Sequence, residues 1–357
     1  MEENKQHKTA LPETEPIPSA QAPEALLDIR GLRVEYHTDE DGVYAVNGLD
    51  LTIGKGESLG LVGETGAGKT TTALSVLRLI ADPPGKIMGG EIWFEGEDML
   101  QAKPARLREI RGSKISVIFQ DPMTSLNPVY SVGDQIAEVI HQHEKCSKEE
   151  GRRKAGDMLE MVGIPRARYD EYPHQFSGGM KQRVVIAMSI ACSPELILAD
   201  EPTTALDVTI QAQVLELMNE LKEKLRTSLL LITHDLGVVA QVCDRVAIMY
   251  AGEIVESGTI AEVFDHPHHP YTIGLFGSIP SLDETAEKLK PIQGQMPDPT
   301  ELPEGCAFAP RCPYATGACR TRKPEMTGVG GTQMVRCLAH QGVFESPELM
   351  EEVRHGR

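Results

Sequence analysis

Residues 63–70 (Gly-Glu-Thr-Gly-Ala-Gly-Lys-Thr) match the pattern G-x-x-x-x-G-K-[ST] of a loop that binds the phosphates of a nucleotide. Backbone N–H groups of such a loop point at the phosphates, and the N-terminus of the following helix strengthens the attraction. We expect Lys69 to reach the β- and γ-phosphates and the Thr70 hydroxyl to bind Mg²⁺. The motif therefore predicts a site for ATP, made by Gly63, Glu64, Thr65, Gly66, Ala67, Gly68, Lys69, Thr70 and Thr71.

Two neighbouring carboxylates, Asp200 and Glu201, end an apolar run that begins at residue 196. The run is typical of a buried strand, and an acid at the end of such a strand holds Mg²⁺ in P-loop nucleotide hydrolases. Successive side chains along a strand point to opposite faces, so the side chain of Glu201 should project from the face opposite that of Asp200. Glu201 is then a candidate general base for the water that attacks the γ-phosphate.

These motifs need a sheet whose strands end at a common edge. Residues 58–62 are typical of a buried parallel strand and residues 71–80 of a helix, which puts the phosphate loop at a strand-to-helix turn. Between residues 180 and 250, helices alternate with apolar strands, as in a mainly parallel sheet covered on both faces. Residues 25–60 alternate apolar and polar positions as antiparallel strands do, and residues 132–162 have helical spacing. The sequence therefore predicts an α/β fold.

Together with residues 176–180 (Phe-Ser-Gly-Gly-Met), these motifs resemble the nucleotide-binding subunits of ATP-binding-cassette (ABC) transporters over residues 25–285. The resemblance implies a P-loop fold of ABC type, with a mixed sheet core, an antiparallel β subdomain and a helical signature subdomain at about 121–180. It implies that Ser177, Gly178 and Gly179 close on the ATP bound by a second ATPase subunit. Met180 stands where glutamine is commonest, at a position that we expect to orient the loop rather than touch phosphate.

The same resemblance implies roles for four further residues. Gln120 is similar to the glutamine that senses Mg²⁺ and the attacking water, and His234 to the histidine that contacts the γ-phosphate. Asp207 resembles the aspartate of the D-loop. Tyr36 resembles the aromatic residue that stacks on adenine, although Tyr44 is near enough to compete for that role. The expected catalytic residues are thus Glu201, His234 and Gln120, and the expected Mg²⁺ ligands are Thr70, Gln120 and Asp200.

Four of the seven cysteines, Cys306, Cys312, Cys319 and Cys337, gather near the C-terminus. Disulfides are disfavoured in the cytosol, so a metal site is the more natural use of such a set. The spacing lacks the C-x-x-C pairs of zinc ribbons, and four thiolates suit an iron–sulfur cluster or Zn²⁺. Residues 305–313 resemble the C-terminal region of peptide and nickel importer ATPases, which can carry a [4Fe–4S] cluster. We therefore rank that cluster above Zn²⁺ and expect the bound centre to have a structural or regulatory role. His340 is close enough in sequence to replace one of the cysteine ligands.

Composition and patterning give the organisation of the chain. We expect a disordered tail at 1–24, an ABC ATPase domain at 25–285, a small cysteine-rich extension at 286–343 and a tail at 344–357. Histidines and prolines alternate at residues 266–270, which favours a rigid connector over a metal site. The net charge of −18 argues against a nucleic-acid partner. No segment approaches the roughly 20 apolar residues of a membrane-spanning helix.

The resemblance implies an ATPase coupled to transport, on the cytoplasmic face of the cell membrane, that powers import of di- and oligopeptides. The implied partners are two integral membrane permease subunits, a second ATPase subunit that is identical or homologous, and an extracytoplasmic substrate-binding protein. Three alternatives stay open at this point. The substrate is nickel or another small solute, or the chain is a soluble ABC ATPase, or it is an ATPase that senses redox state through an iron–sulfur centre.

Overall fold

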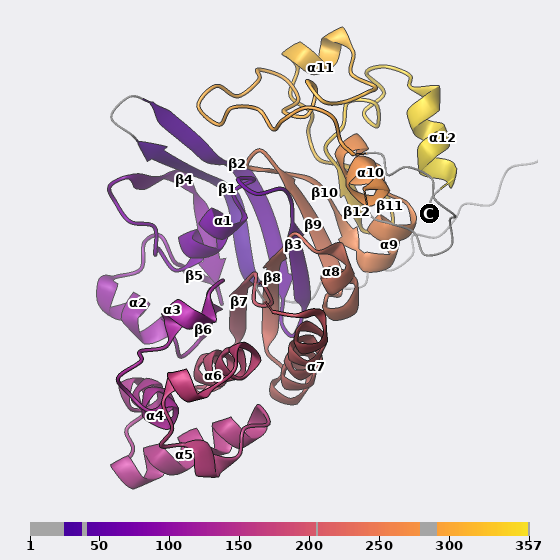
Figure 1. The fold of residues 1–357 in the computed structure, drawn as a ribbon. Coiled ribbons are helices and arrows are strands. Elements are labelled where there is room, and N and C mark those ends of the chain that lie inside the picture. The colour runs from indigo at the N-terminus through magenta and orange to yellow at the C-terminus, as the bar shows by residue number, and fades with distance from the viewer. Residues whose placement is uncertain (1–24, 38–40, 205, 279–290, 356–357) are drawn as a thin grey trace, which may run out of the picture.

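The computed structural model describes residues 25–37, 41–204, 206–278 and 291–355 (Figure 1). The expected tail at 1–24 and the expected domain boundary at residue 285 lie outside the described residues. Among the helices that the structure describes, none is both long and apolar enough to cross a membrane.

In the described residues, eight strands form the central sheet, in the order β11-β12-β10-β9-β3-β8-β7-β6. Strands β3, β6, β7, β8 and β9 run parallel, whereas β10, β11 and β12 are antiparallel. Every residue of β3 and β8 is buried, as a sheet covered on both faces requires. The strands are β3 (Ser58–Val62), β6 (Ile115–Ile118), β7 (Leu196–Asp200), β8 (Ser228–Thr233), β9 (Arg245–Tyr250), β10 (Glu253–Thr259), β11 (Thr327–Gly330) and β12 (Gln333–Val335).

A second, antiparallel sheet lies beside the first, in the order β2-β1-β4-β5. Its strands are β1 (Ala25–His37), β2 (Gly42–Gly54), β4 (Gly85–Phe94) and β5 (Glu97–Asp98). Apolar side chains of this sheet share one core with α1 and with one face of the central strands. The phosphate loop therefore stands between the two sheets, at the start of α1.

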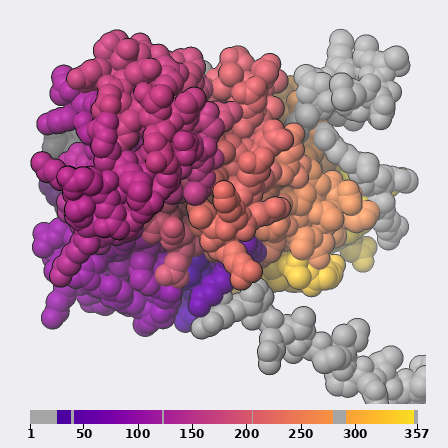
Figure 2. Space-filling view, turned by 90° about the horizontal axis from the view of Figure 1, so that it is seen from below, coloured from indigo at the N-terminus to yellow at the C-terminus, as the bar shows by residue number. Residues whose placement is uncertain are grey.

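Helices cover the central sheet and form a lobe at one end of it. The helices along the sheet are α1 (Lys69–Val76), α2 (Pro104–Ile110), α7 (Val208–Leu225), α8 (Leu236–Val242), α9 (Ile260–Asp265) and α10 (Pro270–Gly277). The lobe holds α3 (Pro122–Ser125), α4 (Val132–His143), α5 (Lys148–Met161) and α6 (Gly178–Ile190), with short 3₁₀ turns η1 (Arg166–Arg168) and η2 (Pro173–Gln175). In Figure 2 the lobe (magenta) meets the part of the chain before it (violet) on one face.

The expected mixed sheet, antiparallel sheet and helical subdomain are confirmed. The serines Ser131, Ser147 and Ser177 cap α4, α5 and α6 by accepting a hydrogen bond from a backbone N–H of the first turn. A serine N-cap thus marks the start of each of these helices. Because Ser177 is the N-cap of α6, the first backbone N–H groups of this helix lie in the segment 177–179.

The C-terminal part of the chain is joined to the ATPase sheet. Its strands β11 and β12 extend the edge of that sheet, because β12 pairs with β10 through Glu256 and Val335. Its helices are α11 (Gly317–Thr321) and α12 (Pro347–His355). Residues 344–355, expected as a tail, include α12, which buries Leu349 and Val353 against the extension. Figure 1 shows this region at the opposite end of the molecule from the helical lobe.

Candidate nucleotide site and cysteine-lined cavity

The phosphate loop is built from glycines that no other residue could replace without movement. Gly66 and Gly68 have φ angles of +86° and +102°, in the left-handed region that favours glycine. A Cβ atom on Gly63 would lie 2.2 Å from the carbonyl oxygen of Met249, and one on Gly68 would lie 2.2 Å from that of Ala45. The loop therefore lies tightly between β9 and β2, and this close packing defines the path of its backbone.

Lys69 lies inside this loop. Its ammonium Nζ donates to the carbonyl oxygens of Gly63 (2.7 Å) and Glu64 (3.0 Å), and its side chain is buried. Burial lowers the pKa of Lys69, and the carboxylates of Glu201, Asp200 and Glu64 act in the opposite direction. The positive charge of Lys69 thus lies where the motif predicts the phosphates of ATP.

Thr70 and Asp200 are brought together across the ends of α1 and β7. Burial raises the pKa of Asp200, and a hydrogen bond with the Thr70 side chain counteracts part of this rise. Mg²⁺ prefers oxygen ligands, including carboxylates and phosphates. The hydroxyl of Thr70 and the carboxylate of Asp200 therefore offer a donor set that fits Mg²⁺.

Two of the expected catalytic residues, Gln120 and His234, meet the carboxylate of the third, Glu201. Glu201 Oε2 accepts from Gln120 Nε2 and from Thr204 Oγ1, each at 2.9 Å, and Oε1 lies 3.1 Å from His234 Nδ1. Burial alone would raise the pKa of Glu201, but the hydrogen bonds with Thr204 and His234 outweigh it and lower the pKa. Glu201 also has a positive φ of +46°, a strained conformation for a residue with a side chain. The carboxylate is thus ionised and held in place, as a general base requires.

Thr204 was missed by the sequence analysis. Its hydroxyl reaches back to Glu201 from three residues downstream, in the turn that follows β7. The signal was present in Pro-Thr-Thr after the two acids, because a threonine three positions after a turn residue can donate to it.

Tyr36 and Tyr44 lie differently toward the phosphate loop. The Tyr36 hydroxyl lies 3.2 Å from Oγ1 of Thr71, on the helix that follows the loop. Tyr44 has an exposed side chain, and its backbone N–H donates to the carbonyl of Pro299 at 2.8 Å. The contact with Thr71 favours Tyr36 as the residue that meets the base.

Replacing Tyr36 with alanine should weaken ATP binding by about tenfold, because stacking of a base on an aromatic ring contributes about 1–3 kcal/mol. Tyr36→Phe should keep most of the affinity, since it retains the ring. The measurement is titration of the purified chain with a fluorescent ATP analogue. Tyr44→Ala is the matched control and should stay within twofold of the wild type. A larger loss with Tyr44→Ala than with Tyr36→Ala would reverse the assignment.

The segment 177–179 begins α6 on the helical lobe. Ser177 and Gly178 are exposed, and the Ser177 hydroxyl accepts from Met180 N at 3.4 Å. A Cβ on Gly179 would lie 2.3 Å from Cγ2 of Ile210, so close packing on α7 requires glycine there. Asp207 caps α7 by accepting from Ile210 N at 3.0 Å. The structure thus gives Ser177 and Asp207 local capping contacts and leaves the N-terminus of α6 open to solvent.

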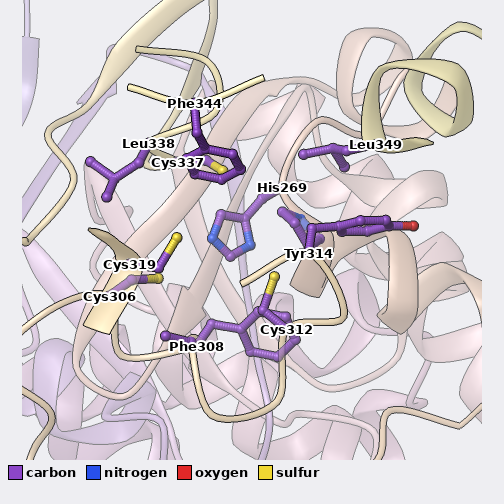
Figure 3. Close-up of a pocket in the computed structure, with 12 residues that line it drawn as sticks. His269, Cys306, Phe308, Cys312, Tyr314, Cys319, Cys337, Leu338, Phe344 and Leu349 are labelled. Atoms are coloured by element: carbon purple, nitrogen blue, oxygen red, sulfur yellow. The ribbon is translucent and has the colours of Figure 1, made fainter. Parts of the chain in front are cut away.

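The four clustered cysteines line one cavity together with His269, Phe308 and Leu338 (Figure 3). The cavity is about 20 Å³, roughly the room that one water molecule needs. Burial raises the pKa of Cys306 to about 11 and that of Cys312 to about 12, while backbone N–H groups of nearby residues act in the opposite direction. These thiols therefore stay protonated at neutral pH unless a cation stabilises the thiolates.

Across the described ranges of the chain, no three His, Cys, Asp or Glu side chains lie close enough to hold one metal ion. The expected cysteine centre is therefore gathered around a cavity but is not arranged as a single-ion site. His340, the expected alternative ligand, has Nε2 at 3.1 Å from the carbonyl oxygen of His268. His269, which sequence reasoning did not single out for this centre, lines the cavity instead.

The histidine and proline segment acts as a connector. His269 is fully buried and caps α10 by accepting from Tyr271 N at 3.0 Å through Nδ1. Burial lowers the pKa of His269 to about 3, so its ring is neutral. The backbone N–H groups of His268 and His269 donate to the buried carboxylate of Glu256, at 2.7 and 2.9 Å. The segment is thus tied to β10 through Glu256.

Comparison with known proteins gives two family matches. The model described as "ABC transporter" matches residues 46–204, and the model described as "Oligopeptide/dipeptide transporter, C-terminal region" matches residues 255–319. The chain is similar to two oligopeptide transport ATP-binding proteins of Bacillus subtilis (strain 168). It is 49% identical to AppD over 318 residues, covering 88% of this chain and 97% of AppD. It is 51% identical to OppD over 332 residues, covering 91% of this chain and 93% of OppD.

The dipeptide transport ATP-binding protein DppD of the same organism is 48% identical over 316 residues, covering 88% of this chain and 94% of DppD. Among solved structures, the chain is similar to the ATP-binding cassette MJ0796, in a dimeric post-hydrolysis state bound to ADP and Pi. The TM-score is 0.59 at 28% identity, and the match covers 66% of this chain and 98% of that one. The similarity to MJ0796 thus covers a smaller share of this chain than the similarity to the three transport proteins.

Proposed function

This chain belongs to the ABC transporter family, in its oligopeptide and dipeptide branch, and from that premise we propose how it uses ATP to power peptide uptake. It is the ATP-binding subunit of a peptide importer and hydrolyses ATP. The observation that carries the mechanism is the convergence of Gln120, Thr204 and His234 on the Glu201 carboxylate. That carboxylate stands at the end of β7, next to Asp200.

ATP binding begins at the phosphate loop. Backbone N–H groups of the phosphate loop donate hydrogen bonds to the phosphates, and the Lys69 ammonium exchanges the carbonyls of Gly63 and Glu64 for phosphate oxygens. The Tyr36 ring receives the adenine. Bound Mg²⁺, for which Thr70, Asp200 and Gln120 offer oxygen ligands, supplies neutralisation of phosphate charge.

Hydrolysis follows from the ionised Glu201. Its carboxylate accepts a proton from water as the water oxygen forms a bond to the γ-phosphorus, and the bond from that phosphorus to the bridging oxygen of ADP breaks. Before the transfer, Thr204 and His234 keep the carboxylate ionised, and the hydrogen bond from Gln120 helps to orient it; after the transfer Glu201 holds the proton as a neutral carboxyl. His234 also offers an N–H donor near the transferring phosphoryl group.

A second ATPase subunit, identical or homologous, completes the site. Ser177 and Gly178 are exposed at the open N-terminus of α6, where backbone N–H groups favour an anion. This end would meet the γ-phosphate of ATP bound by the partner subunit, and the partner would do the same for this chain. Asp207, at the start of α7, would lie in the same contact.

Permease subunits would dock beside Gln120. Phe119, directly before Gln120, is 47% exposed, and Val129 and Tyr130, before α4, are 71% and 55% exposed. Such a patch is typical of a surface that binds another protein. Closure of the two ATPase subunits would move this patch and pull on the permeases. The chain would therefore sit on the cytoplasmic face of the membrane, with an extracytoplasmic binding protein delivering the peptide.

Purification through a tag on this chain, from gently solubilised membranes, tests the assembly. Two integral membrane proteins and a second ATPase subunit should be recovered with it. Recovery of the chain alone, or with ribosomal proteins, would contradict the proposal and favour a soluble ATPase.

The cysteine-lined cavity is proposed to hold a [4Fe–4S] cluster. Four thiols around one cavity match the ligand set of such a cluster, and backbone N–H groups of Phe308 and Ala309 reach the Cys306 sulfur. Zn²⁺ bound by the same four thiolates is the alternative, and the metal content of the purified chain distinguishes the two.

Anaerobic purification should give about four irons and four sulfides per chain, as one [4Fe–4S] cluster requires. Cys319→Ser should lose most of this iron. Cys146→Ser, which changes a cysteine of the helical lobe, should leave it unchanged. One zinc per chain, or iron that survives Cys319→Ser, would contradict the cluster.

A further inference from the structure

The C-terminal extension reaches the phosphate loop directly. Arg311 Nη1 donates to both carboxylate oxygens of Glu64, at 3.0 and 3.1 Å, although 247 positions separate the two residues. Glu64 is the second residue of the phosphate loop, and its backbone N–H donates to the Tyr271 hydroxyl at 3.1 Å. The extension therefore contacts the nucleotide site through a charged pair.

Arg311 is held firmly in this position. Its side chain is only 6% exposed, and its Nε donates to the carbonyl of Gln293 at 3.0 Å. Nη1 also lies 3.4 Å from the Tyr250 hydroxyl. A guanidinium fixed by several contacts keeps a constant geometry toward its carboxylate partner.

The negative charge of Glu64 should weaken ATP binding unless a positive charge balances it. The loop binds phosphates through its N–H groups and Lys69, and a carboxylate within the same loop repels the negative triphosphate. The Glu64 side chain is 31% exposed, so water screens it only in part. Arg311 Nη1 contacts both carboxylate oxygens, so the positive guanidinium offsets the negative charge of Glu64 beside the loop.

We propose that Arg311 of the C-terminal extension is the charge-balancing residue of the phosphate loop, which neutralises Glu64 so that ATP can bind tightly. This rests on the proposed function, because it concerns the same ATP site. Arg311 stands directly before Cys312, and both line a pocket beside α10. ATP affinity is in this way tied to the correct folding of the cysteine-rich extension.

An aromatic cluster continues the connection between the two sites. The Phe308 ring, which lines the cysteine cavity, has its centroid 5.2 Å from that of Tyr250 and 5.5 Å from that of Tyr271. Tyr250 contacts Arg311, and Tyr271 contacts the backbone of Glu64. The cluster therefore holds both members of the pair from the side of the cavity.

The test is the dissociation constant of the purified full chain for Mg²⁺ and β,γ-imido-ATP, an analogue that is not hydrolysed. Arg311→Ala leaves Glu64 unbalanced and should weaken binding by about tenfold. Glu64→Gln removes the charge and should bind at least as tightly as the wild type. The double variant Arg311→Ala/Glu64→Gln should recover to within threefold of the wild type.

The recovery separates charge balance from a merely structural role. Loss of a structural contact would persist in the double variant, since glutamine cannot replace the guanidinium. Arg336→Ala is the matched control. It also removes an arginine of the extension, whose Nε donates to the carbonyl of Ile254 at 2.9 Å, and it should leave nucleotide binding unchanged. Wild-type affinity in Arg311→Ala, or a double variant as weak as Arg311→Ala, would overturn the proposal. Failure of the wild-type chain itself to bind the analogue would overturn nucleotide binding.

Discussion

Replacing Glu201 with glutamine should slow ATP hydrolysis in the assembled transporter by at least about 100-fold, within the range that general-base catalysis contributes. Glutamine keeps the shape of the side chain, and its single amide oxygen can still accept a hydrogen bond from either Thr204 or His234. It cannot take the proton from water. ATP should therefore bind with near wild-type affinity and remain uncleaved between the two ATPase subunits.

The control for this variant lies at the other end of the same strand. Glu195 precedes β7, and its Oε1 lies 3.1 Å from Lys114 Nζ. Glu195→Gln should leave the hydrolysis rate unchanged. Phosphate release, measured at saturating ATP, gives the rate, and filter binding of labelled ATP gives the affinity. Wild-type hydrolysis by Glu201→Gln would remove Glu201 from the role of general base.

The second large effect is expected at Lys69. Lys69→Ala removes the ammonium that stands in the phosphate loop, and we expect kcat/KM for ATP to fall by about 10²- to 10³-fold, as for other groups that stabilise charge in a transition state. Lys69→Arg should not restore activity. The ammonium is buried and donates to the carbonyls of Gly63 and Glu64, and a larger, planar guanidinium does not reproduce this compact donor.

Lys55, on the turn before β3, supplies the matched control. Lys55→Ala removes the same type of side chain near β3 but outside the phosphate loop, and it should keep full activity. Thermal unfolding of each variant shows whether the fold is intact. Retention of more than a tenth of the wild-type kcat/KM by Lys69→Ala would show that the loop binds phosphate without this charge.

Local sequence patterns predicted the parts of the site that lie next to one another in the chain. The strand, glycine loop and helix around Lys69 are continuous, so their spacing alone defines the turn. Asp200 and Glu201 could be predicted in the same way, because they directly follow an apolar run that is typical of a buried strand. The assembly of Gln120, Glu201 and His234 required the resemblance to a family, because these residues end different strands.

The long-range contacts of the extension could not be predicted from the sequence. Pairing of β12 with β10 joins the extension to the ATPase sheet, and the short strand Gln333–Val335 is too brief for a clear pattern. The pair between Arg311 and Glu64 joins residues that are 247 positions apart, and spacing along the chain does not define such a contact. The same holds for His269, which lines one cavity with cysteines that follow it by 37 positions or more.

The most direct test of the central claim is peptide uptake by proteoliposomes that contain the complex purified through this chain. With ATP at the cytoplasmic side and a peptide-loaded binding protein at the other, labelled oligopeptide should accumulate. Glu201→Gln in this chain should reduce its accumulation to the level seen without ATP. ATP hydrolysis by the complex without any peptide accumulation, or uptake that continues unchanged in Glu201→Gln, would contradict the account.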